Sequence, residues 1–359
     1  MFEYVKQWYQ RRFSDPDAVT LVLLLVISFL VIMLFGDLLA PILVAVALAY
    51  LLEWAIQRVE KLGIPRLSAV ALVFTTFLAI NIILLVFLVP VIWQQTVALV
   101  AELPQMLAQM RVLLERLPEL FPEFISEENI STFIDSLTTR TLAFGELLLS
   151  QSLSRIIGIM QLMIYFIVVP LLIFFMLKDK HELLHHIHRM LPTNRRLITQ
   201  VSGEMNQQIM NYIRGKAVEV AVVGIFTYVC FALFDLRYAA LLAVLVGLSV
   251  LIPYIGAVVV TIPVVMVALF QFGWSGTMAW VLICYLIIQI LDGNLLVPLL
   301  FSEAVSLNPV YIIAAVLVFG GLWGFWGVFF AIPLASLVKA VLVALSSQSA
   351  PVEDAGTKT

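Results

Sequence analysis

Long apolar runs, separated by shorter polar segments, repeat along the whole chain. Runs without a charged residue occupy residues 18–35, 38–52, 67–92, 156–177, 220–234, 239–252, 255–271, 277–291 and 304–338. A helix needs about 20 mostly apolar residues to cross the roughly 30 Å hydrocarbon core of a membrane. The pattern therefore predicts an all-α, polytopic helical membrane protein with about eight transmembrane segments.

The stretch 239–271 leaves the number of crossings open. Pro253-Tyr254-Ile255-Gly256 divides it into two short legs. They are either two tilted spans or a re-entrant hairpin, whose non-helical backbone must be buried in protein or line a wet cavity. The second alternative gives six spans plus a hairpin. The last run, 304–338, is expected to fold back at Gly320-Gly321.

Two polar segments interrupt the apolar pattern, one acidic and one basic. With them, the predicted organisation is an N-terminal cytoplasmic helix and three spans (1–92), an outer amphipathic helical segment (93–155), a span (156–177), a cytoplasmic helical segment (178–216), C-terminal spans with broken helices (217–345) and a cytoplasmic tail (346–359). In the outer segment, apolar residues from Val100 to Leu117 recur every three or four positions, as in a helix. That face either packs on its own domain or the membrane surface, or forms a contact between subunits.

Composition and charge support a membrane protein and set its orientation. The 359 residues are 63% hydrophobic and 12% charged, whereas soluble domains are nearer half apolar and a quarter charged. The net charge of −3 argues against nucleic acid as a partner. Threading the spans alternately puts 15 of the 20 Lys and Arg residues on one side, which the positive-inside rule makes cytoplasmic. Both termini are then cytoplasmic.

All four histidines lie in the basic segment, at His181, His185, His186 and His188. Three of them share one face of a helix, a spacing that could hold a metal or sense pH. No cysteine or paired carboxylate completes a ligand set, and the opposite face is apolar. The pattern favours a solvated helix face, so neither a metal nor a cofactor is predicted.

Ionisable groups at membrane depth are costly and therefore mark functional hypotheses. Asp292 is the only charged residue between Arg237 and Glu303, and Glu219 lies just inside a span. Either Asp292 lines a transport path, or it caps a short helix at the cytoplasmic end of a span. Glu219 alternatively pairs with nearby cations. The candidate transport-path residues are Asp292, Asn294, Gln289, Asn308, Glu219 and Arg214.

Prolines and glycines surround these polar residues. Breaks near Asp292 would free backbone carbonyls and helix ends that can coordinate a polar solute or cation, and small residues let helices approach closely. The residues expected to break or pack helices are Pro253, Gly256, Pro263, Pro298, Pro309, Gly320, Gly324, Gly327 and Pro333.

An enzyme is not predicted. Gly273-Trp274-Ser275-Gly276 matches the pattern of intramembrane serine proteases, but every histidine lies upstream in the cytoplasmic segment. An intramembrane aspartyl protease needs two carboxylates, and Asp292 is the only suitable one. No glycine loop for ATP phosphates is present in the sequence.

Several motifs together resemble one bacterial family. They are Phe174-Phe175-Met176-Leu177-Lys178-Asp179-Lys180, Asn211-Tyr212-Ile213-Arg214-Gly215-Lys216, Pro253-Tyr254-Ile255-Gly256 with Pro263, Asp292-Gly293-Asn294 with Pro298, Asn308-Pro309, and Gly320 to Pro333. In this order they resemble the autoinducer-2 exporter family. The resemblance implies a multi-span inner-membrane protein, a homo-oligomer, that moves small solutes. Members are linked to autoinducer-2 export or to sodium/proton exchange.

Residues and resemblance together predict a secondary transporter, or permease, that exports a small polar solute. The expected partners are membrane lipid, a small-molecule substrate and further copies of the chain. A sodium/proton-type cation antiporter is the alternative within transport. A membrane scaffold that recruits partners without transporting anything is the alternative from another class.

Overall fold

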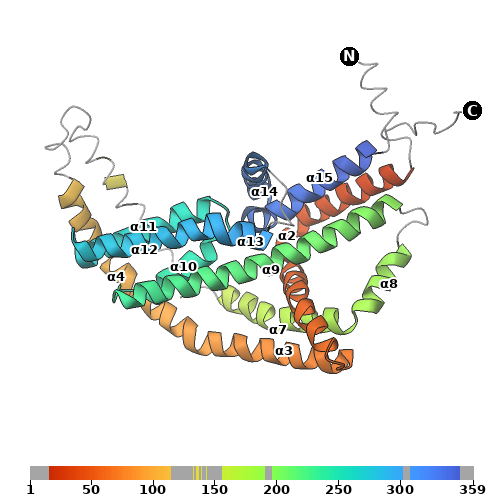
Figure 1. Cartoon of the computed structure of the whole chain (residues 1–359), viewed down its shortest axis with the longest axis horizontal. Coiled ribbons are helices and arrows are strands. Elements are labelled where there is room, and N and C mark those ends of the chain that lie inside the picture. The colour runs from red at the N-terminus through yellow and green to blue at the C-terminus, as the bar shows by residue number, and fades with distance from the viewer. Residues whose placement is uncertain are drawn as a thin grey trace, which may run out of the picture. The chain divides into compact units, whose positions relative to one another are not determined.

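The computed structural model describes residues 16–114, 156–190, 196–301 and 308–347, with a few isolated positions between 115 and 155. Every regular element of these residues is a helix (Figure 1). The α-helices are α2 (Pro16–Glu60), α3 (Arg66–Ile83), α4 (Val89–Leu114), α7 (Ile156–Lys178), α8 (Lys180–Met190), α9 (Arg196–Leu233), α10 (Ala239–Ser249), α11 (Ile255–Phe272), α12 (Gly276–Leu291), α13 (Val297–Phe301), α14 (Pro309–Phe329) and α15 (Ala331–Ser347), and the π-helices are η1 (Leu84–Leu88) and η2 (Asp292–Leu296).

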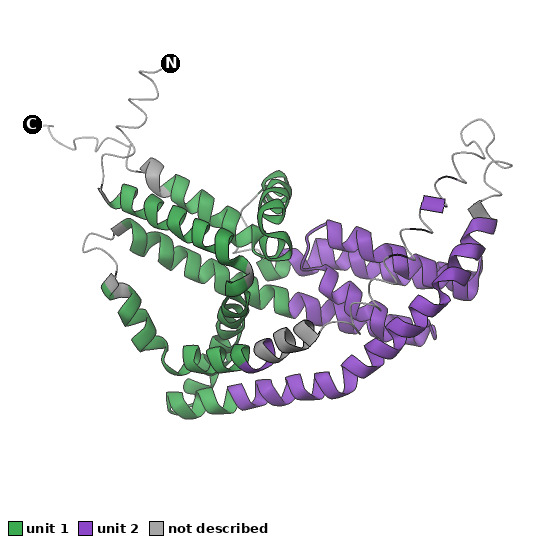
Figure 2. Cartoon of the chain, turned by 180° about the vertical axis from the view of Figure 1, so that it is seen from behind, with its two compact units in different colours: residues 1–73, 168–217, 299–359 green, residues 74–167, 218–298 purple. Residues whose placement is uncertain are grey.

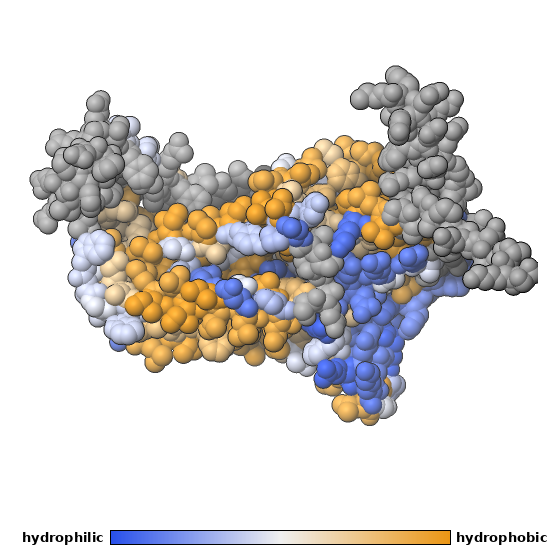
Figure 3. Space-filling model, turned by 45° about the horizontal axis from the view of Figure 1, so that its top comes forward, coloured by the Kyte–Doolittle hydropathy of each residue, from blue (hydrophilic) through white to orange (hydrophobic). Residues whose placement is uncertain are grey.

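The length and hydropathy of the helices confirm the predicted all-α membrane fold. Seven of the described helical segments are long and apolar enough to cross a membrane. Many large apolar side chains are exposed, as expected for a surface in contact with lipid, and Figure 3 shows such residues in orange. Helix α10 has 11 residues and is therefore only about 16 Å long. That is about half of the hydrocarbon core, so α10 is too short for a complete crossing, whereas α11 is one of the seven segments long enough to cross.

Two predicted domain boundaries fall inside continuous helices. Helix α3, η1 and α4 follow one another without a break, past residue 92. Helix α9 likewise continues across residues 216 and 217. The sequence boundaries were drawn where polarity changes, and a change of polarity is not a stop signal for a helix. The boundary at residue 92 marks where one helix becomes less apolar, and the boundary at residue 216 lies one residue from the division between the two compact units, at 217 and 218.

The chain forms two compact units (Figure 2). Unit 1 comprises residues 1–73, 168–217 and 299–359, and unit 2 comprises residues 74–167 and 218–298. Within unit 1, hydrophilic residues gather over α8 and the first turns of α9 (Figure 3). Unit 2 contains the predicted helix-breaking segment 253–263 and three of the predicted path residues, Gln289, Asp292 and Asn294.

The core of unit 2 packs α10, α11 and α12 against α4 and the second part of α9. Met106 of α4 is 2% exposed and belongs to this core, so this part of the outer segment packs on its own unit. Gly224 of α9 and Gly247 of α10 let two backbones meet, because a Cβ on Gly247 would lie 3.1 Å from the Gly224 Cα. Most of the outer segment, from residue 115 to 155, lies outside the described residues, and its predicted subunit contact remains a prediction.

Unit 1 has a smaller core and two bent helices. Leu21, Leu197 and Ala340 bring α2, α9 and α15 together. Helix α2 leaves helical geometry at Phe35, and α14 does so at Gly324, where φ is +59°. The fold-back expected at Gly320-Gly321 is therefore wrong by three or four residues. Gly324 takes the bend because a positive φ is open to glycine without steric cost.

A buried carboxylate, Glu53 of α2, joins three helices of unit 1. Its Oε1 lies 2.8 Å from Lys180 Nζ, and its Oε2 lies 3.2 Å from Arg66 Nη2. Arg66 also donates to the Leu177 carbonyl at the end of α7 and to Glu60. The network thereby connects α2 with the start of α3 and with the junction of α7 and α8. Glu53 was not among the residues predicted from the sequence to have a role.

Candidate functional site

Three polar side chains form a continuous hydrogen-bonded chain between α11 and α12 in unit 2. The Thr261 hydroxyl donates to the Ala257 carbonyl, 2.7 Å away. The Tyr285 hydroxyl lies 2.8 Å from Thr261 Oγ1. Because the Thr261 proton goes to the Ala257 carbonyl, Tyr285 is the donor of this bond. Gln289 Nε2 in turn donates to the Tyr285 oxygen over 3.1 Å. The chain is directional, and the Gln289 side-chain carbonyl takes no part in it.

A pocket of about 350 Å³ lies beside this chain. Thr261, Tyr285 and Gln289 are its polar lining residues, and the other five are apolar. Tyr285 is 4% exposed and packs into the core of unit 2, so the phenol is held rigidly. A pocket with mostly apolar walls and a few converging polar groups is typical of small-molecule sites.

Asp292 follows Gln289 by one turn and is 9% exposed. It begins η2, and its own carbonyl accepts the Val297 N–H. Asn294 is exposed, and its amide donates to the Ile290 carbonyl over 2.9 Å. The structure thus puts Asp292 and Gln289 close together along the helix and directs the Asn294 amide to the helix backbone.

The helix break predicted around Asp292 and Pro298 is wrong. The chain stays helical from α12 through η2 to Phe301, and η2 widens the helix instead of ending it. Pro298 has no N–H for the carbonyl of a preceding turn, a defect that ordinarily kinks an α-helix. A wide π turn just before the proline changes the hydrogen-bond pairing and absorbs the defect.

The other predicted break, at Pro253, is present and shapes the hairpin of unit 2. Helix α10 ends at Ser249, and α11 begins at Ile255 after Tyr254, whose φ is +61°. Gly256 then lies against the Ser249 carbonyl so closely that a Cβ would overlap it. Pro263 lies inside α11 without ending it. The turn thus fixes how α11 leaves the hairpin and where it presents Thr261.

The remaining predicted path residues lie elsewhere. In unit 1, Asn308 accepts the Val310 N–H at 3.0 Å and caps α14, with Pro309 as its first residue. Arg214 donates to the Asn211 side chain over 3.4 Å. In unit 2, Glu219 is 1% exposed on α9. Neither Asn308 nor Arg214 belongs to the pocket beside Tyr285.

The motif Asn211 to Lys216 forms an aromatic contact in unit 1. The Tyr212 hydroxyl donates to the Phe329 carbonyl over 2.8 Å, and its ring lies 5.9 Å from that of Phe301. Lys216 Nζ lies 5.3 Å from the Phe301 ring centroid. A Cβ on Gly215 would press against the same ring. This motif therefore has a packing role, which its mostly polar residues do not indicate.

Two further groups of predicted residues, the C-terminal glycines and the histidines, show packing or exposure but no arrangement of a binding site. The C-terminal glycines allow close packing: a Cβ on Gly327 would overlap the Phe319 carbonyl, and one on Gly320 would lie 2.7 Å from a Val328 methyl. Pro333 belongs to α15.

The histidines lie on α8, where His181, His185 and His186 are exposed and His186 Nδ1 lies 2.9 Å from the Glu182 carbonyl. Among the described residues, no group of His, Cys, Asp or Glu has a metal-binding arrangement.

Sequence reasoning named Gln289 and Asp292 but missed Thr261 and Tyr285. Both lie in runs that are otherwise apolar, where a hydroxyl attracts little notice. The available signal was the four-residue spacing of Tyr285 and Gln289, which puts both on one face of a helix.

Comparisons with known proteins agree on one family. A family model described as "AI-2E family transporter" matches residues 18–347. The chain is 52% identical over 343 residues to PerM of Escherichia coli K12, named provisionally as a permease, covering 95% of this chain and 97% of PerM. It is 24% identical over 328 residues to the "AI-2 transport protein TqsA" of the same strain, covering 89% of this chain and 91% of TqsA.

Proposed function

This chain belongs to the AI-2E family of transporters, and from that premise we propose that it is a secondary transporter of the bacterial inner membrane that exports a small polar solute. The observation that carries the proposal is the chain from Gln289 through Tyr285 to Thr261, beside the apolar core of unit 2. Polar groups at membrane depth are costly unless they serve a path or a partner.

The solute contacts would come from Gln289, with Asp292 one turn further along. The Gln289 carbonyl can accept a hydrogen bond from a hydroxyl group of the solute, while Tyr285 and Thr261 hold the amide in place. Asp292 supplies a buried carboxylate that can bind a proton or a cation. Autoinducer-2 is the first solute to test, because the relative TqsA is named for its transport.

Two other features belong to the same proposal. Both termini lie in the cytoplasm, as the distribution of Lys and Arg supports. The working form is a homo-oligomer, to which the large apolar surface can contribute contacts with lipid and with further copies.

A second candidate within transport is sodium/proton-type exchange, which the burial of Asp292 favours. Asp292 is the only charged residue from 238 to 302, so it is the group in that stretch able to carry charge. Such an exchanger would move protons or sodium without an organic solute.

The test is transport by purified protein in liposomes loaded with autoinducer-2, with and without a proton gradient. We expect gradient-sensitive release by the native chain. Tyr285→Phe, which removes the central hydroxyl, should slow release about three- to tenfold, the factor expected for one or two hydrogen bonds. Asp292→Asn should slow it at least about tenfold and remove its dependence on the gradient.

The matched control is Thr277→Val, which removes an exposed hydroxyl from α12 two turns before Tyr285. It should release solute like the native chain. Native release no faster than from protein-free liposomes would exclude autoinducer-2 as the solute. Sodium-driven proton movement lost in Asp292→Asn would then establish exchange. If sodium-driven proton movement is absent too, the scaffold function remains, and the proposed transport function is wrong.

A further inference from the structure

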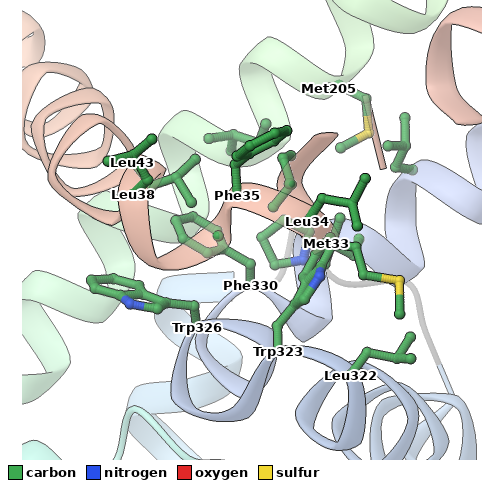
Figure 4. Close-up of a pocket in the computed structure, with 16 residues that line it drawn as sticks. Met33, Leu34, Phe35, Leu38, Leu43, Met205, Leu322, Trp323, Trp326 and Phe330 are labelled. Atoms are coloured by element: carbon green, nitrogen blue, oxygen red, sulfur yellow. The ribbon is translucent and has the colours of Figure 1, made fainter. Parts of the chain in front are cut away.

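Unit 1 contains a second, larger pocket of about 540 Å³, lined by 16 residues of α2, α9, α14 and α15 (Figure 4). None of the lining residues is charged, and the indole nitrogens of Trp323 and Trp326 are their only polar side-chain atoms. The volume lies within the range of ligand pockets, 300 to 1,000 Å³. The walls would leave the hydroxyl groups of a polar solute without partners, so this pocket suits a different ligand from the one proposed for unit 2.

The pocket exists because two helices bend beside it. Phe35, the residue at which α2 leaves helical geometry, lines the pocket, and Gly324, where α14 bends, follows the lining residue Trp323. The stretch 32–36 belongs to the candidate span Val19–Gly36, and 322–326 belongs to the span Pro309–Phe329. The pocket therefore belongs to two candidate spans, which by their length and composition would be surrounded by lipid acyl chains.

One atom of the pocket lacks the partner that its chemistry requires. Trp323 Nε1 is buried and has no hydrogen-bond acceptor among the described residues. Its ring is fixed by Phe29, with centroids 5.1 Å apart, and extends toward Met33 and Leu34 (Figure 4). Buried N–H groups are nearly always satisfied in folded proteins, and leaving one without an acceptor is costly. A ligand oxygen would satisfy it once a neighbouring side chain moves aside, because the nitrogen itself exposes less than 1 Å².

We propose that this pocket binds one acyl chain of a membrane phospholipid, with the ester carbonyl of that chain accepting the Trp323 Nε1–H. The alkyl chain matches the apolar walls, the ester supplies the single acceptor, and the membrane supplies the ligand at the required depth. The proposal concerns unit 1 alone and does not depend on what unit 2 transports.

The test counts the lipids that stay bound to the native chain. The protein is purified in a mild detergent, incubated with palmitoyl-oleoyl phosphatidylethanolamine, washed and analysed by native mass spectrometry. We expect one retained phospholipid per chain. Gly36→Phe should abolish retention, because Gly36 lines the pocket and a Cβ there has no atom within 4 Å, so the new ring can fill the space.

The matched control is Gly203→Phe, which adds the same ring to an exposed site on α9 that is also open; it should retain the lipid. Trp323→Phe keeps an aromatic ring and removes the donor, and should weaken lipid binding about three- to tenfold. It gives an answer even if Gly36→Phe fails to fold. Equal retention by the native chain and Gly36→Phe, no retention by the native chain, a free fatty acid in place of the phospholipid, or unchanged affinity in Trp323→Phe would each overturn the proposal.

Discussion

Replacing Gly256 by alanine should destabilise the α10–α11 hairpin by about 3 kcal/mol or more, a large effect for one methyl group. The added Cβ would overlap the carbonyl group of Ser249. That carbonyl cannot simply move away, because it accepts the Ile252 N–H over 3.0 Å inside the turn. The Gly256 N–H itself donates to the Ile252 carbonyl over 3.0 Å, so relief on either side breaks a hydrogen bond.

The measurement is thermal unfolding of purified protein in detergent, followed by tryptophan fluorescence. Gly256→Ala should lower the apparent Tm by roughly 5–10 °C and reduce the yield of monodisperse protein. Gly276→Ala is the control, because it lies in the same unit at the start of α12 and a Cβ there meets no atom within 4 Å. Equal Tm values for the two variants would show that the hairpin tolerates the methyl group.

Replacing Glu53 by glutamine should cost about 2–3 kcal/mol in the free energy of unfolding. The carboxylate side chain is 7% exposed and faces both Lys180 and Arg66. Removing one member of a buried ion pair leaves the other charge uncompensated, which ordinarily costs 3–5 kcal/mol. The expected value here is lower because the side chains of Arg66 and Lys180 are 24% and 33% exposed and can reach water.

Glu60→Gln separates this effect from a general loss of negative charge. The Glu60 carboxylate also pairs with Arg66, at 3.3 Å, but its side chain is 28% exposed, so its removal should cost less than about 1 kcal/mol. Both variants are compared by the same unfolding experiment. If Glu53→Gln unfolds at the same temperature as Glu60→Gln, the network does not stabilise unit 1 in the way its geometry indicates.

Hydropathy alone predicts the class of this fold, because the need to satisfy every backbone group in lipid leaves few structures open to a chain with so many apolar runs. The break at Pro253 was also predictable, since a proline and a glycine within four residues end a helix. Asp292 was found because a lone carboxylate is conspicuous among 64 uncharged neighbours from 238 to 302.

Long-range partners could not be read from the sequence. Glu53 meets Lys180 across 127 residues, and Thr261 meets Tyr285 across 24. Both separations are far longer than the three- or four-residue spacing of a helix face, so no local pattern in the sequence could predict these pairs. The fold-back was expected at Gly320-Gly321, yet Gly324 bends α14 while Gly320 and Gly321 do not. The choice among neighbouring glycines depends on which backbone must turn, and that is set by the packing of α14 on α15.

The two π-helices have the same neighbours along the chain. η1 is followed by Val89-Pro90, and η2 by Val297-Pro298. A π turn holds one residue more than the α-helical turn that it replaces, and it takes up that residue by widening the helix locally. The helix beyond it therefore keeps its faces, whereas an extra residue in an unbroken α-helix would rotate everything that follows by about a quarter of a turn. In evolutionary terms, each π turn is where this chain tolerates a single-residue insertion within a span. When homologous sequences are aligned, a one-residue gap at 84–88 or 292–296 is structurally acceptable, whereas the same gap elsewhere in α3, α4 or α12 would rotate the rest of that helix by about a quarter of a turn and change which side faces lipid.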